Sequence, residues 1–318
     1  MKTVCAFGID VGSTTVKLVG VDAEGNLVWH WLEQAEPRVE DQVERFLALA
    51  HKRCPTTPAL ALRSSAGASV NRRADNAKPA EAGYERAIYR PSPYQPDVST
   101  SGVTVPLVAT GYGRKLVKQA ARSITEITCH ARGVYRELGH GGTLVDIGGQ
   151  DSKVIGISSK GDVVDFSMND KCAAGTGRFL ENTANRLGVP LERMGQIALA
   201  AAEEVSISST CTVFAESEVI SLIAHGIAVE SILRGLHRSL IKRVVAMIRT
   251  VGLAPPLMLS GGVVQNQAIA RMLEEETGEQ VVIPQYPQLM GAYGAALVAL
   301  GMGDKIQSAN SRESSRMK

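Results

Sequence analysis

The 318-residue sequence has little of what several large classes of protein require. Its formal net charge is only +2, which gives no reason to expect nucleic acid or an anionic membrane as a partner. Aromatic residues make up 4% of the chain, too few for a platform on which nucleic-acid bases stack. No apolar run reaches the roughly 18 residues that a membrane span requires, and the N-terminus does not have the pattern of a signal peptide. We therefore expect a cytoplasmic protein.

Cysteine and histidine are scarce as well. The five cysteines form no CxxC pair and no disulfide pattern, which suits a reducing cytoplasm. The six histidines lack the spacing of metal ligands, and we interpret His130 and His225 as ordinary helix residues. Hydrophobic residues, by contrast, make up 44% of a chain that is long enough for two domains and a substantial core.

Two of the cysteines nevertheless lie in similar surroundings, 39 residues apart. Cys172 lies in the stretch 169–179, in which small residues and a Gly-Thr-Gly turn lead into a helical run. Cys211 follows the hydroxyl residues 208–210, which are typical of a helix start. Because a helix N-terminus stabilises a thiolate, both sulfurs are suited to bind metal. Each chain offers two such ligands, and a two-fold dimer would offer four. The alternative is two buried structural cysteines.

The chain also contains an internal repeat. A shift of 136 residues places 10–28 on 146–164 without a gap. The matched pairs include aspartates, lysines and glycines: Asp10 with Asp146, Lys17 with Lys153, Gly12 with Gly148, Gly20 with Gly156, and Gly25 with Gly161. In each copy the aspartate is followed by a small glycine-containing loop, in which backbone N–H groups can hold phosphate. Such a duplication predicts two similar domains facing each other across a cleft; the alternatives are plain tight turns and two hairpins that match by chance.

Hydrophobic periodicity predicts most other elements. We expect strands at 3–9, 16–21, 27–32, 257–260 and 281–283, and helices at 40–53, 124–138, 179–187, 231–251, from about 264 and from 290. The segment 54–106 holds seven of the thirteen prolines and no sustained period, so it is predicted to be an irregular, protease-sensitive excursion away from the cleft. We expect its deletion to leave the cleft intact. The polar tail 304–318 is predicted to be disordered.

The two repeats and the late Ser260-Gly261-Gly262 turn resemble the superfamily of acetate and sugar kinases, actin and heat-shock ATPases. Four segments resemble one narrow family within it: 111–114, 146–151, 169–179 and 208–218. That family comprises the ATP-dependent activators of 2-hydroxyacyl-CoA dehydratases and the nucleotide-binding subunits of benzoyl-CoA reductases. The resemblance implies an α/β fold of two duplicated ribonuclease H-like domains around a nucleotide cleft, here 1–140 and 141–303. It covers 3–53 and 107–300, and the excursion is longer than in the compact dehydratase activators.

The resemblance also implies roles for individual residues. Asp10 and Asp146 would hold Mg²⁺ largely through waters, and Gln150 or Asp151 would orient the attacking water. The expected nucleotide contacts are Gly12, Ser13, Thr14, Thr15, Lys17, Gly148, Gly149, Gly261 and Gly262. In the family, the two cysteines of each subunit jointly hold one [4Fe–4S] cluster between paired subunits, which here would be Cys172 and Cys211.

The activity that the resemblance implies is ATP-driven transfer of low-potential electrons into an acyl-CoA dehydratase or a benzoyl-CoA reductase. The implied partners are an identical or homologous subunit, the dehydratase or reductase component, and an electron donor such as ferredoxin or flavodoxin. Two alternatives stay open. A small-molecule kinase of the superfamily would need a catalytic base and a substrate pocket, and would have no use for Cys172 and Cys211. An ATP-dependent regulator would keep both cysteines as structural residues.

Overall fold

The computed structural model describes residues 3–54, 105–169, 175–207 and 212–301. Cys172, Cys211, the predicted tail and nearly all of the predicted excursion lie outside these residues. Both described ends of the excursion, Cys54 and Val105, are buried in the same hydrophobic cluster. Among the described residues, no helix is long and apolar enough to cross a membrane.

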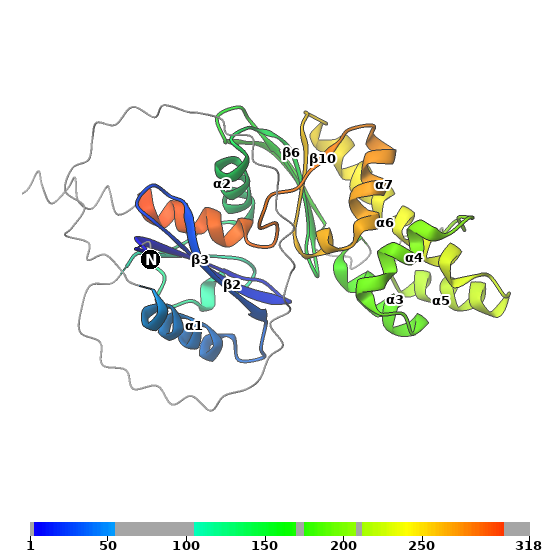
Figure 1. Cartoon of the computed structure of the whole chain (residues 1–318), viewed down its shortest axis with the longest axis horizontal. Helices are drawn as coiled ribbons and strands as arrows, with labels where there is room; N and C mark the ends of the chain where they lie inside the picture. Colours follow the sequence, from blue (N-terminus) through cyan, green and yellow to red (C-terminus); the bar gives the residue numbers. More distant parts are fainter. Residues whose placement is uncertain (1–2, 55–104, 170–174, 208–211, 302–318) are drawn as a thin grey trace, which may run out of the picture.

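Two mixed sheets form the centre of the fold (Figure 1). The strands of the first are β1 (Ala6–Val11), β2 (Thr15–Val21), β3 (Leu27–Gln34), β4 (Leu107–Thr110) and β5 (Arg122–Ser123). Those of the second are β6 (Gly142–Ile147), β7 (Ser152–Ile157), β8 (Val163–Asn169), β9 (Leu257–Ser260) and β10 (Val281–Val282). The strand orders, β3-β2-β1-β4-β5 and β8-β7-β6-β9-β10, are the same arrangement made twice.

The predicted duplication is confirmed down to single hydrogen bonds. In each sheet the first strand pairs antiparallel with the second and parallel with the fourth. The register shifts between Gly20 and Val21 in one sheet and at the matching Gly156 and Ile157 in the other. The loops match too, because the N–H of the loop glycine donates to a carbonyl three residues later at 3.1 Å in one copy and 2.9 Å in the other. The two sheets therefore present equivalent loops at the same strand ends.

Helices cover both sheets, and the predicted elements of the described chain are confirmed with small shifts at their ends. The helices are α1 (Val39–Arg53), α2 (Glu126–Leu138), α3 (Gly177–Leu187), α4 (Met194–Ala200), α5 (Thr212–Ala224), α6 (Val229–Val251), α7 (Gln267–Thr277) and a last helix over 290–301. Short 3-10 turns are η1 (Arg114–Leu116), η2 (Leu191–Arg193) and η3 (Gly262–Gln265). In α6 the predicted apolar stripe faces the core, because Leu236, Leu240, Val244 and Ile248 are all buried.

The sheets are joined by two helices that pack between them. Residues of α2 and of helix 290–301 share one hydrophobic cluster with strands of both sheets. Small residues allow the close approach: a Cβ on Gly294 would lie 1.8 Å from the carbonyl oxygen of Cys129 in α2. The division into domains at 1–140 and 141–303 stays a prediction, and helix 290–301 returns to pack on the first sheet.

The contact at Gly294 gives a first testable expectation. The variant Gly294→Ala should lower the free energy of unfolding by about 3 kcal/mol, because the added methyl group meets backbone that cannot rotate away. Urea unfolding measures this. Gly301→Ala is the matched control in the same helix and should be neutral, since no heavy atom from the rest of the described chain lies within 4 Å of its Cβ position. Equal effects of the two variants would contradict this account of the interface.

Candidate nucleotide site

A cavity of about 450 Å³ lies where the loops of the two repeats face each other. That volume is within the range of small-molecule sites. Every residue that the sequence assigned to catalysis or to nucleotide contact lies in its lining: Asp10, Gly12, Ser13, Thr14, Thr15, Lys17, Asp146, Gly148, Gly149, Gln150, Asp151, Gly261 and Gly262. The structure therefore brings these residues together from four strand ends, although they are up to 252 positions apart, from 10 to 262.

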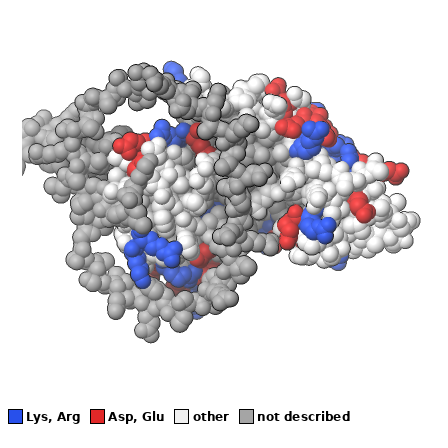
Figure 2. All heavy atoms as spheres, in the orientation of Figure 1, with Lys and Arg blue, Asp and Glu red and all other residues white. Residues whose placement is uncertain are grey.

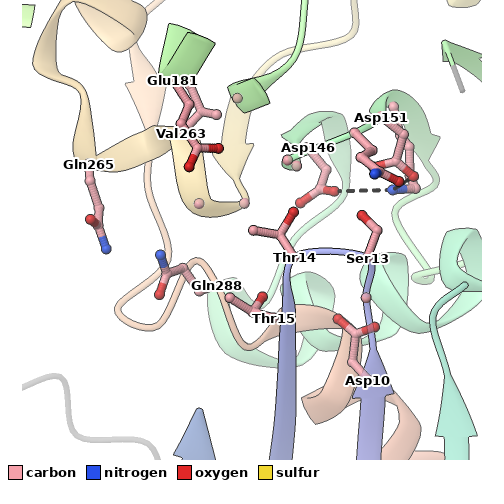
Figure 3. Close-up of a pocket in the computed structure, with 18 of the residues that line it drawn as sticks. Asp10, Ser13, Thr14, Thr15, Asp146, Asp151, Glu181, Val263, Gln265 and Gln288 are labelled. Atoms are coloured by element: carbon pink, nitrogen blue, oxygen red, sulfur yellow. Dashed lines mark ion pairs between the residues drawn. The ribbon is translucent and has the colours of Figure 1, made fainter. Parts of the chain in front are cut away.

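The two loops touch across the cavity. A Cβ on Gly149 would lie 2.1 Å from Thr14 Oγ1, so only glycine allows this approach. Thr14 Oγ1 is buried and has no hydrogen-bond partner among the described residues. Figure 3 shows Ser13 and Thr14 on one loop opposite Asp146 and Asp151 on the other. A buried hydroxyl aimed between two glycine-containing loops fits a ligand with acceptor oxygens, such as a phosphate.

Asp146, at the end of β6, is held by three neighbours. Ser260 Oγ donates to Asp146 Oδ1 at 2.7 Å, His130 Nδ1 lies 3.3 Å from the same oxygen, and Lys153 Nζ lies 3.6 Å from Oδ2. Burial opposes ionisation of this carboxyl, but the charges of His130 and Lys153 outweigh it and hold the pKa of Asp146 well below its usual range. Burial also opposes the charge on His130, but Asp146 raises the pKa of that imidazole. Asp146 is therefore a permanently ionised carboxylate in the cleft.

Lys153 carries the second half of this network. Its side chain is only 3% exposed, and Nζ lies 2.7 Å from Asp151 Oδ2 and 2.9 Å from Glu126 Oε2. Burial alone would lower the pKa of Lys153, but the carboxylates raise it well above its ordinary value. Lys17 repeats the arrangement in the first sheet, with Nζ 3.0 Å from Asp10 Oδ2. Asp151 is thus held by an ion pair, whereas Gln150 is exposed at the loop tip.

The residues of the cavity fit a magnesium nucleotide. Acidic side chains outnumber the lysines in the lining, so polyphosphate would be repelled unless a divalent cation accompanied it. Asp10 and Asp146 offer hard oxygen ligands, and waters and phosphate oxygens usually complete the shell of Mg²⁺. Glu181, Val263 and Gln265 line another part of the cavity (Figure 3). The chain turns at the lining residue Gly261, where φ is 95° and a Cβ would lie 2.3 Å from the carbonyl oxygen of Ile147.

Comparison with known proteins identifies the family. The BadF/BadG/BcrA/BcrD ATPase family matches the chain over residues 7–299. The chain belongs to this family. It is 46% identical over 201 residues, or 63% of this chain and 76% of the other, to a protein of Clostridioides difficile named 2-hydroxyisocaproyl-CoA dehydratase activator. It is 32% identical over 197 residues, or 60% and 70% of the two chains, to a benzoyl-CoA reductase subunit of Thauera aromatica.

A solved structure extends the likeness to nearly the whole chain. The activator of the 2-hydroxyisocaproyl-CoA dehydratase from Clostridium difficile, with bound ADPNP, superimposes with a TM-score of 0.73 at 33% identity. The match covers 97% of this chain and 98% of that one. Membership of the BadF/BadG/BcrA/BcrD ATPase family and this likeness confirm the predicted fold class, two duplicated α/β domains of the actin and sugar kinase type.

The lining also contains residues that were not recognised from the sequence, among them Glu126, His130 and Lys153, which form the charge network around Asp146 and Asp151. Lys153 could have been found, because the repeat places it on Lys17, which was assigned to the nucleotide. His130 lies within helix α2, as expected, but it also lines the cleft beside Asp146, which the sequence did not indicate. No local pattern marks it or Glu126, because only the packing of α2 between the sheets brings them there. His225 is exposed in the segment after α5, as an ordinary surface residue.

The duplicated lysines make the electrostatic account testable. Lys153→Met should lower the free energy of unfolding by about 3–5 kcal/mol at pH 7, because it leaves buried carboxylates without their cation. Mild acid should restore part of this loss, because protonating one of those carboxyl groups removes the unbalanced charge. Lys17→Met is the control and should cost less, since Lys17 pairs with one carboxylate and is more exposed. Equal losses that do not depend on pH would contradict the account.

Proposed function

We propose that this chain is an ATP-hydrolysing iron–sulfur component that drives low-potential electrons into a 2-hydroxyacyl-CoA dehydratase or a benzoyl-CoA reductase. ATP hydrolysis is supported by family membership and by the cavity between the two glycine-containing loops. Its similarity to proteins named as a dehydratase activator and as part of a benzoyl-CoA reductase supports the electron-transfer half. We place it in the cytoplasm, with ferredoxin or flavodoxin as the electron donor.

In this proposal the two loops position ATP for hydrolysis. Backbone N–H groups of both loops and the Thr14 hydroxyl would bind phosphate oxygens, and Asp10 and Asp146 would hold Mg²⁺. Bound Mg²⁺ neutralises the charge that develops on the phosphates. Gln150 or Asp151 orients the attacking water; Lys153 fixes Asp151, so that carboxylate can position a water without changing its rotamer. The glycines after β9 accept the nucleoside.

The proposed metal ligands are Cys172 and Cys211, one on each of two segments that lead into helices. Two of the three thiols within the described residues are poor alternatives, because burial raises the pKa of Cys54 to about 11 and that of Cys129 to about 12. The helices that follow the two cysteines, α3 and α5, pack into one hydrophobic cluster. A [4Fe–4S] cluster supplies one-electron chemistry at low potential, and a two-fold pair of chains would supply its four thiolates.

An exposed apolar face supports a paired subunit. Ile220 and Ile223 of α5, and Ile227 just after it, lie at helical spacing and are 49%, 43% and 36% exposed. A surface of this kind, toward the C-terminal end of the helix that follows Cys211, suits burial against an identical or homologous subunit. The observation that carries the whole proposal is the family match over 7–299, which joins the ATP loops and both cysteine segments in one chain.

Electron transfer that depends on ATP is the test of this function. Anaerobic protein reduced with dithionite should reduce a 2-hydroxyacyl-CoA dehydratase or benzoyl-CoA reductase component only while MgATP is hydrolysed, and not with ADPNP. Phosphate should be released to water without any small-molecule acceptor. Transfer of the γ-phosphate to a metabolite would indicate a kinase instead, and electron transfer at the same rate without ATP would refute the coupling.

A further inference from the structure

One turn of α6, residues 234–238, contacts both the wall of the nucleotide cleft and the segment that leads to Cys211. On the cleft side, His237 Nε2 lies 2.8 Å from Nδ2 of Asn266, a residue of the cavity lining. On the opposite side, the segment 201–207 crosses the helix at Gly235, where a Cβ would lie 1.8 Å from the carbonyl oxygen of Val205. A single turn of helix therefore links these two contacts.

The hydrogen bonds of His237 and Asn266 are directional. His237 Nδ1 lies 2.7 Å from the carbonyl oxygen of Leu233, which can only accept, so Nδ1 carries the proton and Nε2 accepts from the Asn266 amide. Burial lowers the pKa of His237 and keeps the ring in this neutral form. Asn266 Oδ1 accepts from the N–H of Ala268 at 3.1 Å and so caps α7. The Asn266 amide thus donates to His237 through Nδ2 and accepts from Ala268 through Oδ1.

Asn266 also contacts α4, the helix from which segment 201–207 begins. A Cβ on Gly195 would lie 2.3 Å from Asn266 Oδ1. Asn266 therefore lies where α4, α6 and α7 meet, directly after η3, which lines the cleft. A nucleoside bound against η3 would therefore lie beside this junction.

The segment 201–207 is tied to the same turn of α6. Arg234 Nη1 donates to the carbonyl oxygen of Ala201 at 2.9 Å, and Arg238 Nε lies 3.1 Å from Glu204 Oε2. Arg238 also pairs with Glu275 and Glu276 of α7, at 2.9 and 3.1 Å. On the surface of the part of the molecule that contains α4, α6 and α7, acidic and basic side chains lie close together (Figure 2). The chain then continues to Cys211 and into α5.

We propose that His237 and Asn266 are positioning residues that couple the nucleotide state of the cleft, through one helix turn, to segment 201–207, which precedes the proposed cluster ligand Cys211 in the chain. This inference rests on the proposed function. Breaking the His237–Asn266 bond would leave a buried donor and a buried acceptor unpaired, which is costly. When the junction shifts, the turn of α6 that carries His237 therefore shifts with it. The ion pair of Arg238 with Glu204 then moves segment 201–207 together with this turn of α6.

Two substitutions of His237 separate coupling from mere packing. His237→Asn keeps an amide near the position of Nδ1 and can still donate to Leu233, but it is too short to reach Asn266. His237→Gln extends to the position of Nε2 and can accept from Asn266. Hydrogen exchange of the peptides covering 201–207 and 217–224, with and without Mg-ADPNP, is the measurement. The wild type and the Gln variant should show a nucleotide-induced change, and the Asn variant should lose most of it while still binding ADPNP.

Arg238→Gln provides a second variant, on the partly exposed side of the helix, should His237→Asn fail to fold. It should make segment 201–207 exchange faster in both states and remove the nucleotide response. Thr143→Ala removes hydrogen bonds to Gly252 and Ala254, which follow the C-terminal end of α6, 15 residues beyond His237, and it should keep the full response. A retained response in His237→Asn or Arg238→Gln, or equal losses in the Asn and Gln variants, would overturn the inference.

The iron content of the same samples separates the two proposals. Wild-type protein that responds to ADPNP without containing iron would refute the proposed function and leave the coupling route standing. Iron-containing protein in which segment 201–207 does not respond to ADPNP would refute the coupling route alone.

Discussion

Replacing Asp146 with asparagine is expected to reduce the rate of ATP hydrolysis by about 10²–10³-fold, the usual cost of losing one preorganised electrostatic group. Asp146 is an ionised carboxylate at the end of β6, and its partner across the cleft is Asp10. Asp10→Asn should cause a loss of the same order, because both loops must hold the same metal nucleotide. The release of phosphate at saturating MgATP measures both effects.

The choice of asparagine follows from the contacts of Asp146. Alanine would leave His130, Lys153 and Ser260 without their shared partner, so an inactive Asp146→Ala protein could simply be unfolded. Asparagine keeps the shape and an acceptor oxygen. Asp22→Asn is the control: this buried carboxylate of the first sheet accepts from the N–H of Asn26 at 2.7 Å, away from the cavity. Near-normal hydrolysis in both cleft variants would refute a site built from two equivalent loops.

Replacing either Cys172 or Cys211 with serine is expected to abolish iron binding completely. A four-thiolate cluster shared by two chains loses two ligands with each substitution, so the remaining pair cannot hold it. ATP should still bind, since the cleft residues are unchanged. Iron and acid-labile sulfide in anaerobically purified variants are the measurement, and the dimer should loosen as the cluster is lost.

Cys129→Ala and Cys54→Ser are the matched controls for these variants. Both native thiols are buried, with raised pKa values, and they lie within hydrophobic clusters of the first half. Their substitution should leave the iron content unchanged. A cluster that survives Cys211→Ser would return Cys172 and Cys211 to the alternative of structural cysteines.

The parts of the fold that could be predicted are those that local patterns encode. The stripe of α6 and the hairpins of the two repeats follow from the spacing of apolar residues and turn glycines. The gap-free repeat also predicted two similar halves, because segments with the same pattern of apolar residues and glycines fold into similar hairpins. The position of α2 and helix 290–301 between the sheets has no such pattern, since it depends on small residues that meet across more than 150 positions, as Gly294 meets Cys129.

The candidate site divides in the same way. Its loops could be predicted from the aspartates and glycines that end β1 and β6, and the structure places all of them in one cavity. The ion pairs of the site could not be predicted. Lys153 and His130 lie within ordinary strand and helix patterns, and they acquire their partners only through tertiary packing. The link from His237 to Asn266 is a contact of the same kind, between α6 and the cap of α7.

We propose that this ATPase carries an iron–sulfur cluster shared between two chains. Iron content and absorption of the full-length protein, purified without oxygen, test it most directly. A [4Fe–4S] cluster per dimer predicts about two iron atoms and two acid-labile sulfides per chain, in a brown protein that runs as a dimer. Colourless, iron-free anaerobic protein that still hydrolyses ATP would contradict the account and leave only a nucleotide-dependent regulator or kinase.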